Sequence, residues 1–118
     1  MSGVLLVAHG SRAPETVQTM EKIAEMTRRL LPEKRIQVAY MEFQEVNIEK
    51  GLLMLMAEGV TSVKVLPYFL FDGIHIKEDI PKELAAFGAA HPQMEITLGK
   101  TLGTDERLAQ IVAERIEN

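Results

Sequence analysis

The feature that most constrains the fold is a regular alternation between short apolar runs and segments with helical spacing. Residues 4–8, 36–41 and 62–66 are short and largely apolar, which is typical of strands covered on both faces. Residues 15–31, 47–57 and 104–116 repeat apolar side chains every three or four positions, which indicates helices. Asp79 and Pro81 predict the start of another helix that runs to about Gly88. Residues 94–98 alternate apolar and polar side chains like an edge strand, so the predicted order is βαβαβαβα.

Such an alternation implies a mostly parallel sheet with helices on both faces, because its crossovers are right-handed. We predict a doubly wound α/β fold with four parallel strands in the order 2-1-3-4, which is a small flavodoxin-like arrangement. In this class, ligands bind beyond the carboxyl ends of the strands where the strand order reverses. That switch point lies between the first and third strands. The apolar residues of the last helix are expected to face inward, and these are Leu108, Ile111, Val112 and Ile116.

Composition narrows the class of protein further. The chain has 118 residues, which suits one compact domain, and it has no cysteine, which excludes disulfides, iron–sulfur clusters and thiol catalysis. No apolar stretch approaches about 18 residues, and the N-terminus is typical of a strand, so neither a membrane span nor a signal peptide is expected. The net charge is −4 and the basic residues are scattered, which argues against nucleic-acid binding. We expect a cytoplasmic protein.

Two histidines follow the two strands at the predicted switch point. His9 comes directly after the first strand, and His75 lies in the loop after the third. Two imidazoles that face one crevice suit a divalent transition metal, and a free imidazole accepts a proton near neutral pH. Each histidine taken alone is more simply explained as a helix cap or a loop residue. The pair, at the ends of adjacent strands, favours a functional site.

Acidic, polar and aromatic residues occur beside these histidines in the sequence. Glu42 and Glu45 follow the second strand, where a carboxylate could ligate a metal, orient a histidine, bind a pyrrole N–H or lie in a solvated turn. Ser11 lies in a loop that opens onto a helix N-terminus, which suits either an anionic group or a plain turn. Residues 68–71 place three aromatics and a leucine after the third strand. They are suited to cover a flat apolar ligand, to contact a partner chain or to pack under the third helix.

Two stretches of the sequence resemble the class II chelatases of the CbiX family. The run V-L-L-V-A-H-G-S-R at 4–12 is similar to the opening of the family. The run P-Y-F-L-F-D-G-I-H-I-K-E-D-I-P at 67–81 is the more specific match, and residues 40–43 and 98–103 also fit. The resemblance covers essentially the whole chain. It implies that residues 1–118 form a single chelatase half-domain, similar to one half of the longer members, and that the protein works as a homodimer.

The resemblance implies an enzyme, a lyase that inserts Co²⁺ into the anionic tetrapyrrole sirohydrochlorin during cobalamin biosynthesis without ATP. The metal is then a substrate, and no cofactor is permanently bound. The alternatives are a nickel- or ferrochelatase for coenzyme F430 or siroheme synthesis, and a tetrapyrrole or metal carrier without turnover. A flavodoxin-like nucleotide or phosphate binder that uses the loop at Gly10 is a further alternative.

The resemblance also assigns roles to individual residues. It makes His9 the proton acceptor and a metal contact, and it makes His75 the second metal contact. It associates Glu45 and the loop from Leu70 to His75 with the substrate, and Glu42 matches a glutamate that the family commonly carries. Together with Ser11, the expected substrate-binding residues are Ser11, Glu42, Glu45, Leu70, Phe71, Asp72, Gly73, Ile74 and His75.

Overall fold

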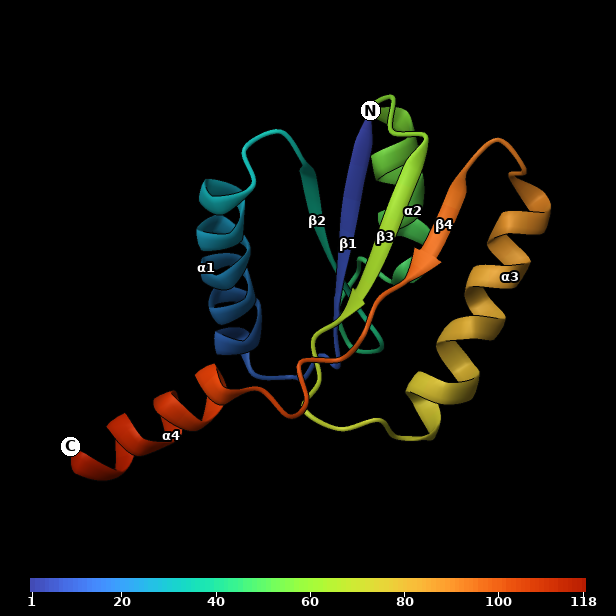
Figure 1. Cartoon of the computed structure of the whole chain (residues 1–118). Coiled ribbons are helices and arrows are strands. Elements are labelled where there is room, and N and C mark those ends of the chain that lie inside the picture. Colours follow the sequence, from blue (N-terminus) through green and yellow to red (C-terminus); the bar gives the residue numbers. More distant parts are fainter.

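The computed structural model confirms the doubly wound α/β fold with one parallel sheet in the order β2-β1-β3-β4 (Figure 1). The structure describes residues 1–118, apart from the side chains of His75 and Ile76. The strands are β1 (Ser2–Ala8), β2 (Arg35–Tyr40), β3 (Ser62–Pro67) and β4 (Glu95–Leu98). The α-helices are α1 (Pro14–Leu30), α2 (Ile48–Ala57), α3 (Ile80–Ala90) and α4 (Glu106–Glu117), and a π-helix, η1 (His75–Asp79), precedes α3.

The central strand β1 pairs in parallel with both β2 and β3, so three strands end at one edge of the sheet. Backbone hydrogen bonds continue past the strands there. The Met41 N–H donates to the Ala8 carbonyl at 2.9 Å, and the Tyr68 N–H donates to the Val7 carbonyl at 2.7 Å. The loops after β1, β2 and β3 therefore leave the sheet side by side, at the predicted switch point.

Helices cover the two faces of the sheet unequally. Both α2 and α3 pack on one face, whereas α1 packs on the other (Figure 1). The buried residues under α2 and α3 include Leu5, Val7, Ile48, Leu52, Leu55, Val63, Val65, Ile80, Leu84 and Phe87. The buried cluster on the α1 face is smaller and comprises Leu6, Ala8, Met20, Ala24, Ile36, Val38 and Tyr40.

Local sequence explains most of the helix boundaries. The Asn47 side chain caps α2 as predicted, because its Oδ1 accepts the Lys50 N–H at 2.8 Å. Proline occupies the first turn of both α1 and α3, where its missing N–H removes no helical hydrogen bond. Residues 75–78, which the sequence predicts to be loop, belong to η1, and the Lys77 N–H donates to the carbonyl of the preceding Gly73 at 3.1 Å. A short π-helix leaves no periodic signal in the sequence, although π-helical turns are frequent at functional sites.

The prediction that the apolar residues of α4 face inward is wrong. No residue of α4 is buried, although every side chain of this helix is described. The helix extends away from the sheet beyond the start of α1 (Figure 1). Ile111, Val112 and Ile116 expose 49%, 57% and 77% of their surface. Periodicity identified the apolar face of this helix correctly but carries no information about what covers that face.

The chain has no candidate membrane span among its described residues, since none of the helices found there is both long and apolar enough.

Candidate functional site

The carboxyl edge of the sheet brings His9 and Glu42 into direct contact. His9 Nε2 lies 2.9 Å from Glu42 Oε1, and both side chains are about half exposed. The backbone supports this contact, because the Glu42 N–H donates to the His9 carbonyl at 3.1 Å. The edge of the Phe69 ring packs beside the imidazole, with the ring centroids 6.3 Å apart. A carboxylate that bonds to an imidazole fixes the orientation of the ring.

The His9–Glu42 pair forms part of the wall of a cavity of about 460 Å³ at this edge. The other lining residues are Met41 next to Glu42, Asp79 at the end of η1, and Lys82 and Glu83 in the first turns of α3. Burial raises the pKa of Glu83, and the neighbouring charges of Asp79 and Glu49 raise it further. Three acidic residues and one lysine in the lining make the local potential negative, which favours the approach of a divalent cation.

The backbone of His75 begins η1, in the segment between β3 and α3. The side chain of His75 lies outside the described part of the structure, so its role as second metal contact stays a prediction. Among the described side chains, no three His, Asp or Glu residues form a ready-made metal site. The described part of the site therefore supplies a histidine–carboxylate pair, and a third ligand has to come from elsewhere.

A residue that the sequence analysis did not select, Gln44, holds the loop after β1. Gln44 Oε1 accepts the Ser11 N–H at 3.2 Å, and Gln44 Nε2 donates to the Ser11 carbonyl at 2.6 Å. Gly10 has a φ of +94°, and a Cβ at this position would lie 2.1 Å from the Glu42 carbonyl oxygen. Only glycine permits this approach of the two loops. No motif or periodicity marks Gln44, because its role depends on the distance between two loops.

The polar groups of Ser11 are engaged by the start of α1 and by Gln44. The hydroxyl bonds to the Thr16 hydroxyl and also accepts the Ala13 N–H at 3.1 Å. The Ser11 N–H is bound by Gln44, as described above. These contacts order the turn that leads into α1. They are the contacts expected of a plain turn, one of the two readings of this loop from the sequence.

The two glutamates after β2 have different surroundings. Glu42 contacts His9, whereas the Glu45 carboxylate pairs with the Lys50 ammonium and is 82% exposed. The hydrogen bond from Lys50 lowers the pKa of Glu45, and the lysine charge lowers it further. Between these two glutamates, Phe43 adopts a left-handed φ of +70°, and the Arg12 guanidinium lies 5.1 Å from its ring centroid. A bulky residue in this conformation is uncommon and typical of functional loops.

The aromatic run after β3 is partly packed into the protein and partly exposed. Tyr68 and Phe69 pack partly buried against the two cores of the protein. Leu70 and Phe71 are 52% and 81% exposed, and Ile74 is 65% exposed. Asp72 in the same loop accepts a hydrogen bond from the Thr101 hydroxyl at 3.0 Å. The loop thus presents an apolar surface on the same edge of the sheet as His9, and exposed patches of this kind mark binding surfaces.

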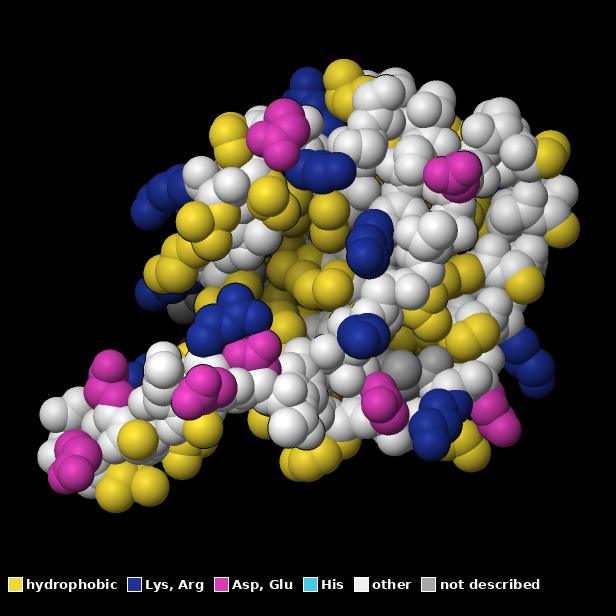
Figure 2. All heavy atoms as spheres, in the orientation of Figure 1, with side chains coloured by type: hydrophobic (Ala, Val, Ile, Leu, Met, Phe, Trp, Pro, Cys, Tyr) yellow, Lys and Arg dark blue, Asp and Glu magenta, His cyan; other side chains and the backbone are white. Residues whose placement is uncertain are grey.

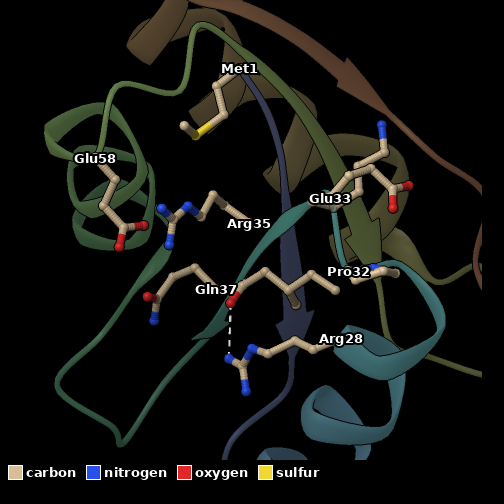
Figure 3. A pocket seen from close by; sticks show the side chains of 9 residues that line it. Met1, Arg28, Pro32, Glu33, Arg35, Gln37 and Glu58 are labelled. Atoms are coloured by element: carbon tan, nitrogen blue, oxygen red, sulfur yellow. Dashed lines mark hydrogen bonds between the residues drawn. The ribbon is translucent and has the colours of Figure 1, made fainter.

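A larger cavity, of about 660 Å³, lies away from this edge (Figure 3). The turn after α1, the start of β2 and the end of α2 form its walls, with Met1 at the start of β1. Arg28 Nη2 donates to the Ile36 carbonyl there at 2.9 Å, which is the dashed line in Figure 3. Because this cavity lies at the amino ends of the strands, it is not where a doubly wound sheet binds its ligand.

The fold and this site define a doubly wound α/β protein with a histidine–carboxylate pair at the switch point of its sheet. The model of the CbiX family matches residues 3–118. The chain therefore belongs to the CbiX family.

Curated relatives and solved structures agree with this assignment. The chain is 32% identical to the sirohydrochlorin cobaltochelatase of Methanopyrus kandleri and covers 96% of it, with 99% of the chain aligned. It is 33% identical to the sirohydrochlorin ferrochelatase of Priestia megaterium, but it spans only 44% of that protein, with 98% of the chain aligned. The sirohydrochlorin chelatase SirB of Bacillus subtilis subspecies spizizenii, solved in complex with cobalt, superposes with a TM-score of 0.90 at 30% identity. That alignment covers 98% of the chain and 50% of SirB.

Proposed function

We propose that this protein is a sirohydrochlorin chelatase that inserts Co²⁺ into the macrocycle without ATP. The observation that carries the proposal is the His9–Glu42 pair beside a carboxylate-lined cavity at the switch point. Membership of the CbiX family and the names of its relatives supply the chemistry. The cobaltochelatase of Methanopyrus kandleri matches along nearly its whole length, which favours cobalt over nickel or iron.

Insertion exchanges two pyrrole N–H protons for one divalent metal ion, so the site must deliver a metal and accept protons. Nε2 of His9 and Oε1 of Glu42 are 2.9 Å apart. Adjacent ligands at about 2.1 Å from an octahedral ion lie about 3 Å apart, so these two atoms suit a single metal ion with little movement. The side chain of His75, from the loop after β3, would be the third ligand.

The two roles of His9 follow one another in this scheme. An imidazole nitrogen that is bound to a metal cannot accept a proton at the same time. His9 therefore first holds the metal and, once the metal has passed to the ring, takes one of the two pyrrole protons on Nε2, while the other proton leaves to solvent. Glu42 then stabilises the imidazolium across the 2.9 Å contact.

The exposed apolar residues Leu70, Phe71 and Ile74 support a binding surface for the flat macrocycle. The backbone of Asp72 and Gly73 would run along the edge of the ring. We keep Ser11 and Glu45 as predicted substrate contacts, although Ser11 is bonded to Gln44 and Glu45 to Lys50 in this structure. Ser11 would have to leave Gln44 to bind a macrocycle carboxylate, and Glu45 would have to leave Lys50 to accept a pyrrole N–H. Glu42 has the stronger support, because it already contacts His9.

We further propose that residues 1–118 act as one half of a cleft and that two copies form the working enzyme in the cytoplasm. The chain corresponds to 50% of SirB at a TM-score of 0.90, which supports equivalence to one half of a longer chelatase. A homodimer would place two such halves face to face. No permanently bound cofactor is expected, because the metal is consumed as substrate.

The test is the absorbance change of sirohydrochlorin when purified protein is mixed with Co²⁺, Ni²⁺ or Fe²⁺. We expect multiple turnovers, fastest with Co²⁺, and loss of turnover in the His75→Ala variant. His91→Ala is the matched control, because His91 packs on the Phe87 ring at 4.4 Å, next to the last turn of α3. Near-normal turnover by folded His75→Ala protein would overturn the site. Binding without turnover by the parent chain would identify a carrier instead.

A further inference from the structure

Two apolar surfaces of the chain lie uncovered. The first is the stripe on α4 formed by Leu108, Ile111, Val112 and Ile116, none of which is buried. The second is a groove of about 410 Å³ beside α1, on the sheet face that α1 only partly covers. Figure 2 shows this groove as a hollow floored by hydrophobic side chains, with α4 projecting below it. In a doubly wound fold, a face of this kind is normally covered by a helix.

The groove is suited to hold an apolar helix. Its walls include Val4, Ile23 and Leu66, which are only partly buried against the core on this face. Two lysines, Lys34 and Lys64, also line it. A stripe of four large apolar residues on one helix is the complement that such a groove lacks.

We propose that α4 of one copy of this chain docks in the groove of a second copy, and that the exchange is reciprocal. The contact is isologous, because each copy contributes one α4 and one groove, and it closes as a symmetric dimer. This inference deepens the proposed dimer by assigning its interface, but it does not depend on the proposed chemistry.

The segment before α4 indicates that the occupant is a second copy and not the same chain. The Leu102 N–H donates to the Phe69 carbonyl at 2.9 Å, and the Thr101 hydroxyl bonds to Asp72. Gly103 is tight against the same loop, because a Cβ there would lie 3.1 Å from the Leu70 carbonyl oxygen. These contacts hold the segment as far as Gly103, and α4 then leads away from the sheet (Figure 1). Because α4 is held away from the sheet of its own chain, it is positioned to dock in the groove of another molecule.

The charges on the two surfaces are compatible with docking. Beside the apolar stripe, α4 carries three glutamates and two arginines. Arg115 is already paired with Glu114, and Arg107 with the capping residue Asp105. The other two glutamates, Glu106 and Glu117, share the helix face of Gln110, opposite the apolar stripe, so docking beside Lys34 and Lys64 brings no unpaired charge of α4 into the groove.

The exchange has a consequence for the candidate site. The segment that holds α4 bonds to residues 69 and 72, which lie in the loop proposed to seat the macrocycle. Docking of α4 on the second copy would therefore fix this loop in both copies. The dimer then stabilises the half of each site that has the fewest contacts of its own.

Site-specific disulfide formation tests the exchange directly, because the chain has no cysteine of its own. Thr27→Cys places a thiol in the groove, and Val112→Cys places one on the apolar stripe. We expect an affinity-tagged Thr27→Cys chain mixed with an untagged Val112→Cys chain to form a covalent heterodimer on mild oxidation. Gln110→Cys, on the opposite face of α4, is the matched control and should form far less. Equal yields from the two α4 positions would overturn the proposal.

The double variant Thr27→Cys/Val112→Cys separates the two possible occupants. Exchange predicts cross-linked species of twice the chain mass or more, whereas docking of α4 on its own chain gives an oxidised monomer and overturns the proposal. Light scattering adds a test without cysteines. Val112→Asp should shift the parent dimer to monomer, and Gln110→Asp should not. A Val112→Asp protein that stays dimeric would overturn the exchange while leaving the proposed chelatase intact.

Discussion

The two halves of the candidate site are built in opposite ways. The half after β1 and β2 is held by many local contacts, among them the His9–Glu42 pair and the two hydrogen bonds of Gln44. The half after β3 exposes Phe71 and Ile74 by 81% and 65% and ends in a π-helix. We infer that the first half positions the reacting groups in advance, while the second remains open for a large flat ligand.

Glycine substitutions should distinguish the two halves of the site most clearly, by their effects on stability. Gly10→Ala puts a Cβ at 2.1 Å from the Glu42 carbonyl oxygen at a φ of +94°. We expect a loss of at least about 2 kcal/mol in the free energy of unfolding, because the two loops must separate. Gly73→Ala is the control in the open half, where a Cβ would meet nothing within 4 Å. Denaturant unfolding measures both, and equal losses would contradict the difference between the halves.

The sequence predicted the framework of the site well and its local contacts less well. The alternation of strands and helices predicts the strand order, and the order alone places the loops after β1 and β3 side by side. Asn47 is identifiable as a cap because capping depends on a residue three positions away in the same segment. Gln44 and the exposed position of α4 depend on contacts between distant segments or on what covers a face. No local pattern records such contacts.

A second comparison concerns the two glutamates after β2, which the sequence could not distinguish. Glu42→Gln removes the negative charge beside His9, and we expect the rate of metal insertion to fall about 10- to 100-fold, as for other residues that orient a metal-binding histidine. Glu45→Gln is the comparison, and its smaller effect should fall on KM for sirohydrochlorin, since Glu45 is a predicted substrate contact that does not touch His9 and pairs with Lys50. Equal losses in both variants would show that the His9–Glu42 contact contributes no more to the rate of metal insertion than the Glu45–Lys50 pair.

The pH dependence of these two variants follows from the pKa of Glu45. Lys50 lowers this pKa, so the Glu45–Lys50 pair contributes stability above the ordinary carboxyl pKa and loses it as the pH falls through the lowered value. At neutral pH, Glu45 is therefore ionised and paired, and its replacement should leave the pH profile of insertion near neutrality unchanged. A large loss of insertion at neutral pH should occur in Glu42→Gln alone, because only this variant removes the negative charge beside His9.

The smallest expected effect belongs to the open half and tests whether it binds the macrocycle. Phe71→Ser removes an exposed aromatic ring, so the free energy of unfolding should hardly change. If the ring covers the macrocycle, KM for sirohydrochlorin should rise about five- to tenfold, since burial of part of a Phe side chain stabilises a complex by about 1 kcal/mol or slightly more. The value of kcat should hold, because the side chain takes no part in proton or metal transfer. Met26→Ser, at a 55% exposed apolar position on α1, is the control for a general loss of surface hydrophobicity. A rise in KM confined to Phe71→Ser would place the substrate on this loop, and unchanged kinetics would remove the loop from the site while leaving the His9–Glu42 half intact.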